Sequence, residues 1–442
     1  MQNMKKIFVL GGGIAGVTTA MGLKKLGFDV TIFYKKRAFS AYEGFSQKTK
    51  EGLLLNACKN ASNLLEKQSL RNANWGETQN KVNYEFVVSR VLLDEALILD
   101  AKEFKIKCIK ASVVKNTKFL EKKAVILYKK DSITFEAEAD FIVDARGRFT
   151  PFKDEYINGP KSFSLLQELE MPNAVQSKTS IDSVEDGWIW QAYIGEKKGY
   201  IQFTCDEEAA NKISNFQQML EYINKQSLNL WSLEGSKPVK KLVKRDSFCK
   251  IHKTIVSDKF LLVGDSASSI DPLSGNGAFQ ALSMASVAPY VINTILNFPQ
   301  NSETAKSFYK KRVEFIFNKF SKVGKEFYNL ESRYKTNFWQ KRQTWPKDEK
   351  ELKKVPRIEE EGILKDKFIY PNEVVITENN PMGVWLFNNI DVVDLSKYCL
   401  ENNRDKALKY FEEFCIKNSL IDKNIKILKK WLFSQKLLQF EV

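Results

Sequence analysis

The chain has 442 residues, enough for a large hydrophobic core and two or three domains. Its net charge of +15 comes from lysines spread along the whole sequence without a nucleic-acid-binding motif, so we expect anionic partners but no nucleic acid. A single histidine and six scattered cysteines without a CxxC pair argue against a metal site and predict a reducing, cytoplasmic compartment. No apolar run approaches the ~20 residues of a transmembrane helix, so no membrane partner is expected.

The first predicted elements are a strand, a glycine turn, a helix and a second strand within residues 5–37. An apolar run at 7–10 ends at the sequence GGGIAG, residues 11–16, and a second apolar run follows the helix at 30–33. This order predicts a dinucleotide-binding βαβ unit. The alternatives are a glycine turn in an ordinary α/β domain, or a signal peptide, which the glycine cluster argues against.

Each glycine of this turn has an expected part in binding. Gly11 lets the chain turn sharply, Gly13 lets backbone N–H groups approach a pyrophosphate, and Gly16 lets helix and strand pack closely. Ile14 and Ala15 lie at the start of the helix, whose N-terminus carries unpaired N–H groups and partial positive charge.

The end of the second strand departs from the dinucleotide-binding pattern. An acidic residue usually holds the ribose hydroxyls there. Here the position is Tyr34, followed by Lys35, Lys36 and Arg37. These basic residues suit the 2′-phosphate of NADP, or are solvated lysines of a lysine-rich chain. The βαβ unit alone does not separate FAD from NAD(P).

The following segment is predicted to alternate helices and strands. A helix is expected from about Thr49, a turn at 75–77, and a strand from Val87 that leads into an amphipathic helix. Arg90 stands at the start of this helix, where its guanidinium can reach phosphate or adenine in a bidentate way. Residues 141–148 are predicted to be a buried strand ending in a tight turn.

Residues 162–243 alternate polar and apolar side chains, which predicts a β-rich segment. In its densest aromatic stretch, Trp188, Trp190 and Ala192 share one face of a strand. That face can stack against a planar ring. The alternative, two core tryptophans in a sheet, is equally consistent with the pattern.

A second glycine-containing motif follows a buried strand at 260–263. The strand ends at Gly264-Asp265, and a long helix begins after the sequence SGNG at 274–277. Asp265 can hold a polyol hydroxyl. The N–H groups of the SGNG turn form an anion-accepting nest at a helix N-terminus.

These motifs, in this order, give a resemblance that covers the first ~330 residues. The chain resembles the flavoprotein monooxygenases of the p-hydroxybenzoate hydroxylase fold, and within them the tryptophan halogenases and the monooxygenases that hydroxylate tryptophan in peptides. Segments 43–46, 75–77, 271–274 and 338–339 are more similar to the second group.

The resemblance implies an α/β protein in which a Rossmann-like FAD-binding domain is interleaved with a β-sheet substrate domain and followed by a C-terminal helical module. The expected boundaries are 1–160 with 245–345 for the FAD-binding domain, 161–244 for the substrate domain, and 350–442 for the module. The module ends in two amphipathic helices between Asp405 and Leu438. We expect it to hold a large substrate or, alternatively, to serve packing or dimerisation.

The implied cofactor is FAD, and the implied electron donor is a separate flavin reductase or NAD(P)H. The substrate is expected to be an aromatic small molecule or a peptide or protein, with its pocket bordered by Trp188 and Trp190. The implied cofactor-binding residues are Gly11, Gly13, Ile14, Ala15, Gly16, Arg37, Ser46, Arg90, Gly264, Asp265, Pro272, Gly275, Asn276 and Gly277.

Three departures count against halogenation. Halogenases carry a WxWxIP signature, whereas residues 188–191 keep the two tryptophans without the Ile-Pro. They place Glu two residues before a Thr-Gly, where this chain has Ser274 before Asn276-Gly277. The insertion that carries their catalytic lysine is shortened between Ser46 and Arg90. Hydroxylation of an electron-rich aromatic ring is therefore predicted, with halogenation as the alternative and a non-enzymatic, flavin-binding peptide-delivery protein as the third.

Overall fold

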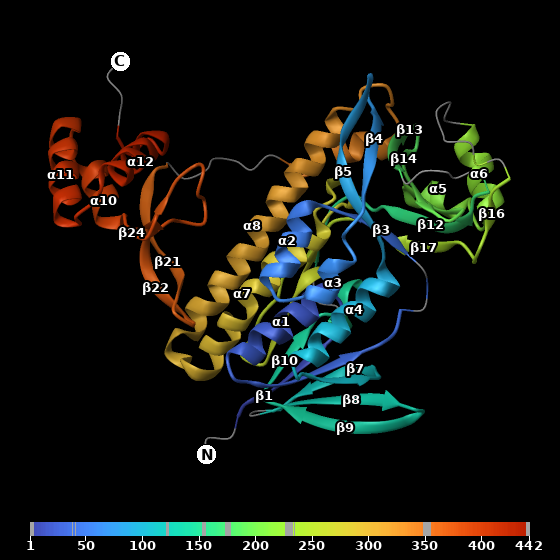
Figure 1. The fold of residues 1–442 in the computed structure, drawn as a ribbon, viewed down its shortest axis with the longest axis horizontal. Coiled ribbons are helices and arrows are strands. Elements are labelled where there is room, and N and C mark those ends of the chain that lie inside the picture. The colour runs from blue at the N-terminus through green and yellow to red at the C-terminus, as the bar shows by residue number, and fades with distance from the viewer. Residues whose placement is uncertain are drawn as a thin grey trace. The chain divides into compact units, whose positions relative to one another are not determined.

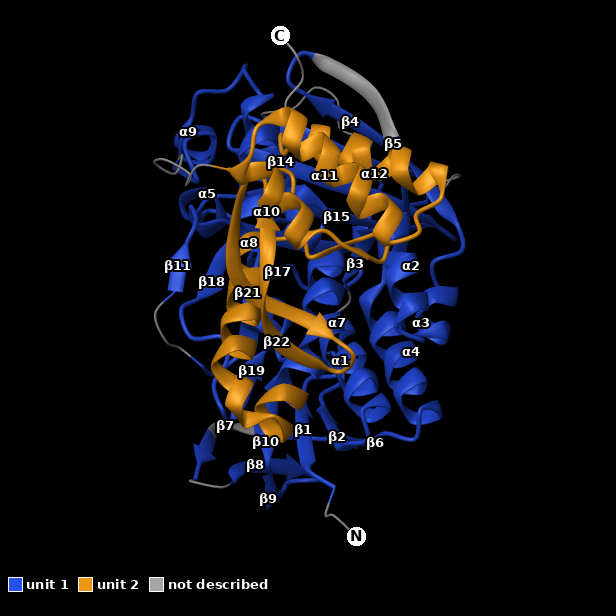
Figure 2. Ribbon diagram, turned by 90° about the vertical axis from the view of Figure 1, so that its left-hand side faces the viewer, with its two compact units in different colours: residues 1–292, 316–347 blue, residues 293–315, 348–442 orange. Residues whose placement is uncertain are grey.

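The computed structural model describes residues 4–37, 39, 41–120, 123–152, 156–172, 178–225, 233, 235–347 and 355–438. The chain forms two compact units, one of residues 1–292 with 316–347 and one of residues 293–315 with 348–442 (Figure 2). The fold is mixed α/β, with a parallel sheet, a larger sheet and C-terminal helices, as the sequence predicted.

The first unit is built around a five-stranded parallel sheet, in which all strands end at one edge. Its strands, in spatial order, are β19 (Phe260–Leu262), β10 (Phe141–Asp144), β1 (Lys6–Leu10), β2 (Asp29–Tyr34) and β6 (Lys107–Lys110). Leu10 stands opposite both Asp144 and Phe33, so the carboxyl ends of the three central strands are level. The connection from β1 to β2 is helix α1 (Ile14–Lys25), which confirms the predicted βαβ unit.

Helix α7 (Gly277–Asn297) begins at the last residue of the second glycine motif and packs against α1. At Gly22 of α1, a Cβ atom would stand 2.5 Å from Cγ of Pro289, so the glycine permits this close approach. The 21 residues of α7 are long and apolar enough to cross a membrane, and 72% of its apolar window is buried inside the structure. The expectation that no such segment exists was wrong, because isolated polar residues interrupt the run without lowering its mean hydropathy much.

A nine-stranded sheet forms the rest of the first unit's framework (Figure 1). Its strands are β16 (Lys237–Pro238), β12 (Phe163–Glu170), β15 (Lys198–Cys205), β14 (Gly187–Gly195), β13 (Lys178–Val184), β4 (Gln68–Trp75), β5 (Thr78–Ser89) and β3 (Tyr42–Phe45), with β17 (Val243–Asp246) paired to β12. The β4–β13 pair is parallel. The sheet therefore includes β3, β4 and β5, from a segment that the sequence analysis placed in the FAD-binding domain, because pairing between distant segments leaves no local pattern.

The remaining elements of the first unit surround these two sheets. They include a small three-stranded antiparallel sheet. Their bounds are α2 (Gln47–Leu55), α3 (Lys59–Asn63), α4 (Arg90–Glu103), β7 (Ser112–Phe119), β8 (Ala124–Lys130), β9 (Ile133–Ala139), η1 (Gly147–Phe149), β11 (Tyr156–Asn158), α5 (Glu207–Asn211), α6 (Phe216–Asn224), β18 (Lys250–His252), η2 (Gly264–Ser266), β20 (Ser268–Ser269), η3 (Pro272–Ser274) and α9 (Asn337–Gln343).

The second unit contains a β-hairpin that the sequence analysis missed. Its elements are η4 (Pro299–Asn301), β21 (Arg357–Lys365), β22 (Phe368–Ile376), β23 (Leu386–Phe387), β24 (Ile390–Asp391), α10 (Val393–Glu401), α11 (Arg404–Lys417) and α12 (Asp422–Ser434), with the first half of α8 (Ser302–Asn329). The hairpin packs on the segment 293–315, where Asn293 Nδ2 donates to the Lys367 carbonyl at 2.8 Å. The two amphipathic helices predicted for the C-terminal end are confirmed as α11 and α12.

Candidate functional site

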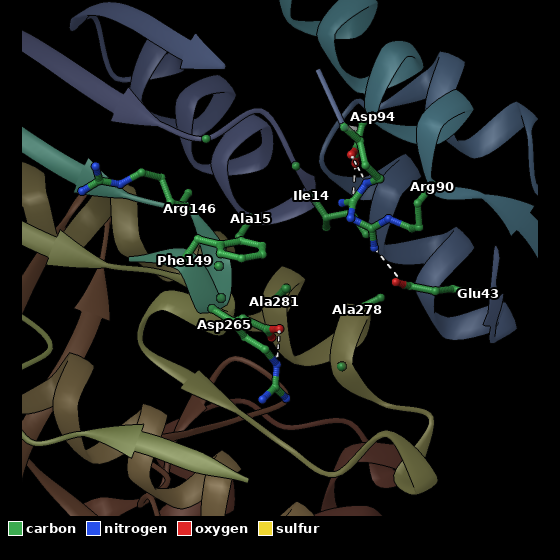
Figure 3. A pocket seen from close by; sticks show the side chains of 18 of the residues that line it. Ile14, Ala15, Glu43, Arg90, Asp94, Arg146, Phe149, Asp265, Ala278 and Ala281 are labelled. Carbon is green, nitrogen blue, oxygen red and sulfur yellow. Dashed lines mark hydrogen bonds and ion pairs between the residues drawn. The ribbon is translucent and has the colours of Figure 1, made fainter. Parts of the chain in front are cut away.

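A cavity of about 1300 Å³ runs through the first unit, from the carboxyl ends of the parallel strands to one face of the nine-stranded sheet. The first turns of α1, α4 and α7 open onto it (Figure 3). The residues predicted for cofactor or substrate binding that line it are Gly11, Gly13, Ile14, Ala15, Arg37, Arg90, Trp188, Trp190, Gly264, Asp265, Pro272, Gly275 and Gly277. The structure thus brings together motifs that lie more than 250 residues apart.

The glycine turn after β1 has the geometry of a phosphate cradle. Gly11 has a φ of +127°, and a Cβ atom there would overlap the Ala145 carbonyl. A Cβ atom at Gly16 would overlap the Gly11 carbonyl, so these positions require glycine. Helix α1 starts after Gly13 with no capping side chain and no acidic residue in its first turn. Its N–H groups and partial positive charge are therefore left for an anionic ligand, which fits a pyrophosphate.

Four charged side chains form a cluster beside this cradle. Arg90 Nη1 lies 2.9 Å from Glu43 Oε2, and Arg90 Nη2 lies 3.3 Å from Asp94 Oδ1. Arg37 Nε donates to the other Asp94 oxygen at 2.9 Å (Figure 3). The two predicted arginines thus meet at Asp94, a residue that the sequence analysis missed. The one-turn spacing from Arg90 to Asp94 on α4 was the available signal.

The cluster keeps the Glu43 carboxylate ionised. Burial raises the pKa of Glu43, but the positive charges of Arg90, Arg245 and Arg37 outweigh this effect and lower it overall. Lys36 lies 2.7 Å from Glu95 of α4. The basic residues that follow Tyr34 are therefore partly neutralised by acidic residues of α4. This pairing argues against the interpretation that they bind the 2′-phosphate of NADP.

The second glycine motif lies directly against the first turn of α1, beside the cradle. Gly264 has a φ of +64°, and a Cβ atom there would stand 2.8 Å from Cβ of Ala15. The Asp265 side chain is 40% exposed and lies 3.5 Å from Arg148 Nε. Phe149, which is 77% exposed, also lines this part of the cavity (Figure 3). Arg148 and Phe149 were not predicted, because the turn after β10 lacks a recognisable motif.

A buried chain of hydrogen bonds holds the loop that leads into α7. Trp188 Nε1 donates to the Tyr328 hydroxyl at 3.2 Å, and this hydroxyl donates to Asp271 Oδ2 at 3.0 Å. The other Asp271 oxygen accepts the Leu273 N–H at 2.9 Å. Burial raises the pKa of both Asp271 and Tyr328. Beyond this loop, a Cβ atom at Gly277 would meet nothing within 4 Å, so the backbone opens onto the cavity.

Three of the residues predicted to bind the cofactor do not line the cavity. Gly16 serves helix packing, as described above. Ser46 caps α2 by accepting the Thr49 N–H at 3.3 Å, so its position does not support a role in binding. The Asn276 side chain donates to the Ser274 carbonyl at 2.5 Å, which holds the turn rather than a ligand.

The wall opposite the cradle is the aromatic face of the large sheet. Trp188 and Trp190 share this face with Ala192, as predicted. They are only 2% and 8% exposed and pack in an aromatic core cluster, yet both also line the cavity. The two tryptophans are therefore core residues and part of the cavity wall at the same time. Trp190 Nε1 donates to Glu85 Oε1 at 3.1 Å. The sequence analysis missed Glu85 and its neighbour Arg71.

Comparison with known proteins identifies the family to which this chain is similar. The tryptophan halogenase family matches residues 35–373, well over half of the chain. A tryptophan 2-halogenase of Chondromyces crocatus is 24% identical over 370 residues, 77% of this chain and 70% of that protein.

Solved structures extend the similarity to nearly the whole chain. A structure of QhpG, described as a peptidyl tryptophan dihydroxylase essential for tryptophylquinone cofactor biogenesis, is 28% identical, with a TM-score of 0.83 over 98% of this chain and 99% of that one. The flavin-dependent halogenase CmlS shares the fold at 16% identity, with a TM-score of 0.75 over 99% and 96%. The chain therefore belongs to the tryptophan halogenase family and is an FAD-dependent oxidoreductase.

Proposed function

We propose that this protein is an FAD-dependent monooxygenase that hydroxylates an electron-rich aromatic ring, an indole or a phenol, carried by a peptide. The observation that carries the proposal is the similarity to the peptidyl tryptophan dihydroxylase, which spans both chains almost completely at 28% identity. The cavity supports it, because a phosphate cradle and an aromatic wall line one continuous space.

The residues of the chain have separate tasks in this proposal. The glycine turn at 11–16 and Asp265 would hold the nucleotide and sugar parts of FAD, and the turn at 275–277 would face its ring. When bound, FAD supplies the activation of dioxygen. Trp188 and Trp190 would orient the substrate ring, and their buried side chains would give it a fixed apolar surface to pack on.

The cations that line the substrate end of the cavity support one of the two candidate reactions. Among the described residues of the nine-stranded sheet, the cavity is lined by Arg71 and Arg245 and by no lysine. The lysines that line it follow β2 or belong to α4 and β6, around the phosphate cradle. This arrangement favours hydroxylation, since the catalytic lysine expected of a halogenase has no described counterpart on the sheet.

Halogenation is the second candidate, because the family and the 24% identical tryptophan 2-halogenase favour it. In either reaction a separate flavin reductase or NAD(P)H would supply the electrons. We also propose a cytoplasmic location, on the basis of the cysteine pattern.

Product analysis separates the two reactions. The FAD-loaded protein is incubated with a flavin reductase, NADH and a tryptophan-containing peptide encoded beside its gene, under labelled dioxygen, with and without chloride or bromide. Hydroxylation predicts a product that gains labelled oxygen whether or not halide is present. A product that carries halogen and forms only with halide would instead establish the second candidate, and reactions without reductase are the control.

A further inference from the structure

The cavity face of the nine-stranded sheet carries a charged pair formed by Arg71 on β4 and Glu85 on β5. In the β4–β5 register Glu85 stands opposite Ser69, and Arg71 lies two residues further along β4, so both side chains leave the same face of the sheet. Arg71 Nη1 lies 3.9 Å from Glu85 Oε2, and both residues line the cavity beside Trp190.

Glu85 is held in place from two sides. It is 7% exposed, and one of its oxygens accepts the Trp190 indole N–H at 3.1 Å. Its other oxygen lies over Gly44 of β3, where any Cβ atom would overlap it. The Glu85 side chain is therefore fixed in position at the sheet face, where it lies within ion-pair distance of Arg71.

Arg71 has more donors than partners. Within the described part of the chain the Arg71 guanidinium forms no hydrogen bond, its Nε atom is buried without a partner, and the 3.9 Å from its Nη1 atom to Glu85 Oε2 is too long for a hydrogen bond. Its Nη1 atom lies 4.0 Å from where a Cβ atom of Gly275 would stand, next to the turn that precedes α7. A guanidinium has five donors and no acceptor, and leaving them unpaired is costly, so this group is suited to an incoming oxygen.

We propose that Arg71, held by Glu85, anchors the substrate by binding a carbonyl or carboxylate oxygen that it carries beside its aromatic ring. The inference rests on the proposed aromatic substrate and adds the second recognition element. The ring then lies along the wall formed by Trp190 and Ile181, which also line the cavity. In a peptide substrate the oxygen is a backbone carbonyl, and in a free acid it is a carboxylate.

The test measures binding without turnover. Three probes with the same ring are titrated calorimetrically into the FAD-loaded, oxidised protein without reductant. These are indole-3-propionate, indole-3-propionamide and indole, which carry a carboxylate, a carbonyl and no oxygen. The native protein should prefer the first or second probe to indole. Arg71→Gln should weaken the binding of that probe by about ten- to a hundredfold, the range for a hydrogen bond to a charged group. The affinity of this variant for indole should equal that of the native protein.

Two further variants test whether the effect is specific to the Arg71–Glu85 pair. The amide of Glu85→Gln can still accept the hydrogen bond from Trp190 but lacks the charge that holds Arg71. This variant should therefore show a smaller loss of affinity for the same probe than Arg71→Gln. Arg357→Gln is the matched control, since Arg357 pairs with Glu359 at 2.9 Å on β21 and does not line the cavity. It should leave all three affinities unchanged.

The outcomes divide cleanly. A selective loss for the amide identifies a peptide carbonyl, and a selective loss for the acid identifies a carboxylate; either supports the inference. Equal affinity of the native protein for all three probes overturns it, as does an equal loss for indole in Arg71→Gln or no change at all. Product analysis is independent of these results: intact anchoring without any hydroxylated product contradicts only the proposed function.

Discussion

At the scale of single residues, Asp265 tests the cofactor end of the cavity most directly. We expect Asp265→Ala to purify with less FAD and to bind it about tenfold or more weakly, because an acceptor for a sugar hydroxyl is lost and a hydrogen bond to a charged group is worth about 1.5–3 kcal/mol. The absorbance ratio of flavin to protein and a fluorescence titration measure this. Asp29→Ala, an exposed residue at the start of β2, is the control.

The same experiment checks the identity of the dinucleotide. The native protein should release FAD rather than FMN or NAD when it is denatured. Unchanged flavin content in Asp265→Ala would show that this carboxylate does not contact the cofactor.

Trp190 tests the substrate end. Replacing it by Phe keeps a ring in the wall but removes the indole N–H that pairs with Glu85, so we expect a loss of about 1–3 kcal/mol in the free energy of unfolding. Trp190→Leu should in addition raise KM for the aromatic substrate, since the stacking surface is lost. Chemical denaturation and steady-state kinetics measure the two effects. A folded Trp190→Leu enzyme with native KM and kcat would remove this residue from the substrate site.

At the scale of elements, one carboxylate ties the β4–β5 turn to the segment that follows α8. Glu331 is a fully buried side chain that accepts the Gly76 N–H at 2.8 Å and pairs with Arg333 Nη2 at 2.7 Å. It also accepts a hydrogen bond from Ser183 of β13. Burial raises its pKa, but the hydrogen bonds from Arg333, Ser183 and Gly76 outweigh this and lower the pKa to about 2.

This shift predicts an acid-dependent contribution to stability. The folded pKa lies below the value of about 4.3 for an unfolded glutamate, so the stabilisation is complete above about pH 5 and is lost as the pH falls toward 2. It amounts to at most about 3 kcal/mol. Urea unfolding should therefore show a difference between the native chain and Glu331→Gln that is larger at pH 7 than at pH 3.

The matched control is Glu326→Gln, at an exposed position of α8, which should change the free energy of unfolding by less than about 0.5 kcal/mol at either pH. A difference between the native chain and Glu331→Gln that stays constant from pH 7 to pH 3 would contradict the assigned ionisation.

At the scale of the whole molecule, substitutions in the second unit can test whether this unit binds a large substrate. Helix α12 buries Leu428, Trp431 and Leu432 in its core. It leaves four lysines exposed: Lys423, Lys426, Lys429 and Lys430. Changing all four to Glu should lower kcat/KM for a peptide with an acidic segment, most strongly at low salt, and leave the oxidation of a small aromatic unchanged. If the variant and the native protein have the same kcat/KM for the peptide, the second unit serves packing or dimerisation instead.

Charge reversal is a sharper test than truncation near Trp345. Such a cut removes the β21–β22 hairpin but keeps residues 293–315, on which it packs. A Cβ atom at Gly362 would stand 2.9 Å from Cβ of Phe308, so the two segments are in close contact. The truncated chain would expose this surface, and any loss of activity would have two explanations.

The sequence by itself determined the parts of this protein whose constraints are local. The GGGIAG turn could be recognised because strand, turn, helix and strand follow one another within residues 5–37, and because Gly11 and Gly16 leave no room for a side chain. The Gly264-Asp265 turn was recognisable for a similar reason. These two motifs were enough to predict the parallel sheet, the long helix behind the second motif and the cofactor.

Only the tertiary structure decided the substrate end and the make-up of the units. Arg71 and Glu85 reach Trp190 because β4 pairs in parallel with β13, more than 100 residues away, and a pairing of that kind leaves no periodic signal in either segment. The hydrogen bond from Gly76 to Glu331, 255 residues away, likewise leaves no signal in the sequence around either residue. Local patterns specify turns and helices, whereas the neighbours across a sheet are chosen by the packing of the whole chain.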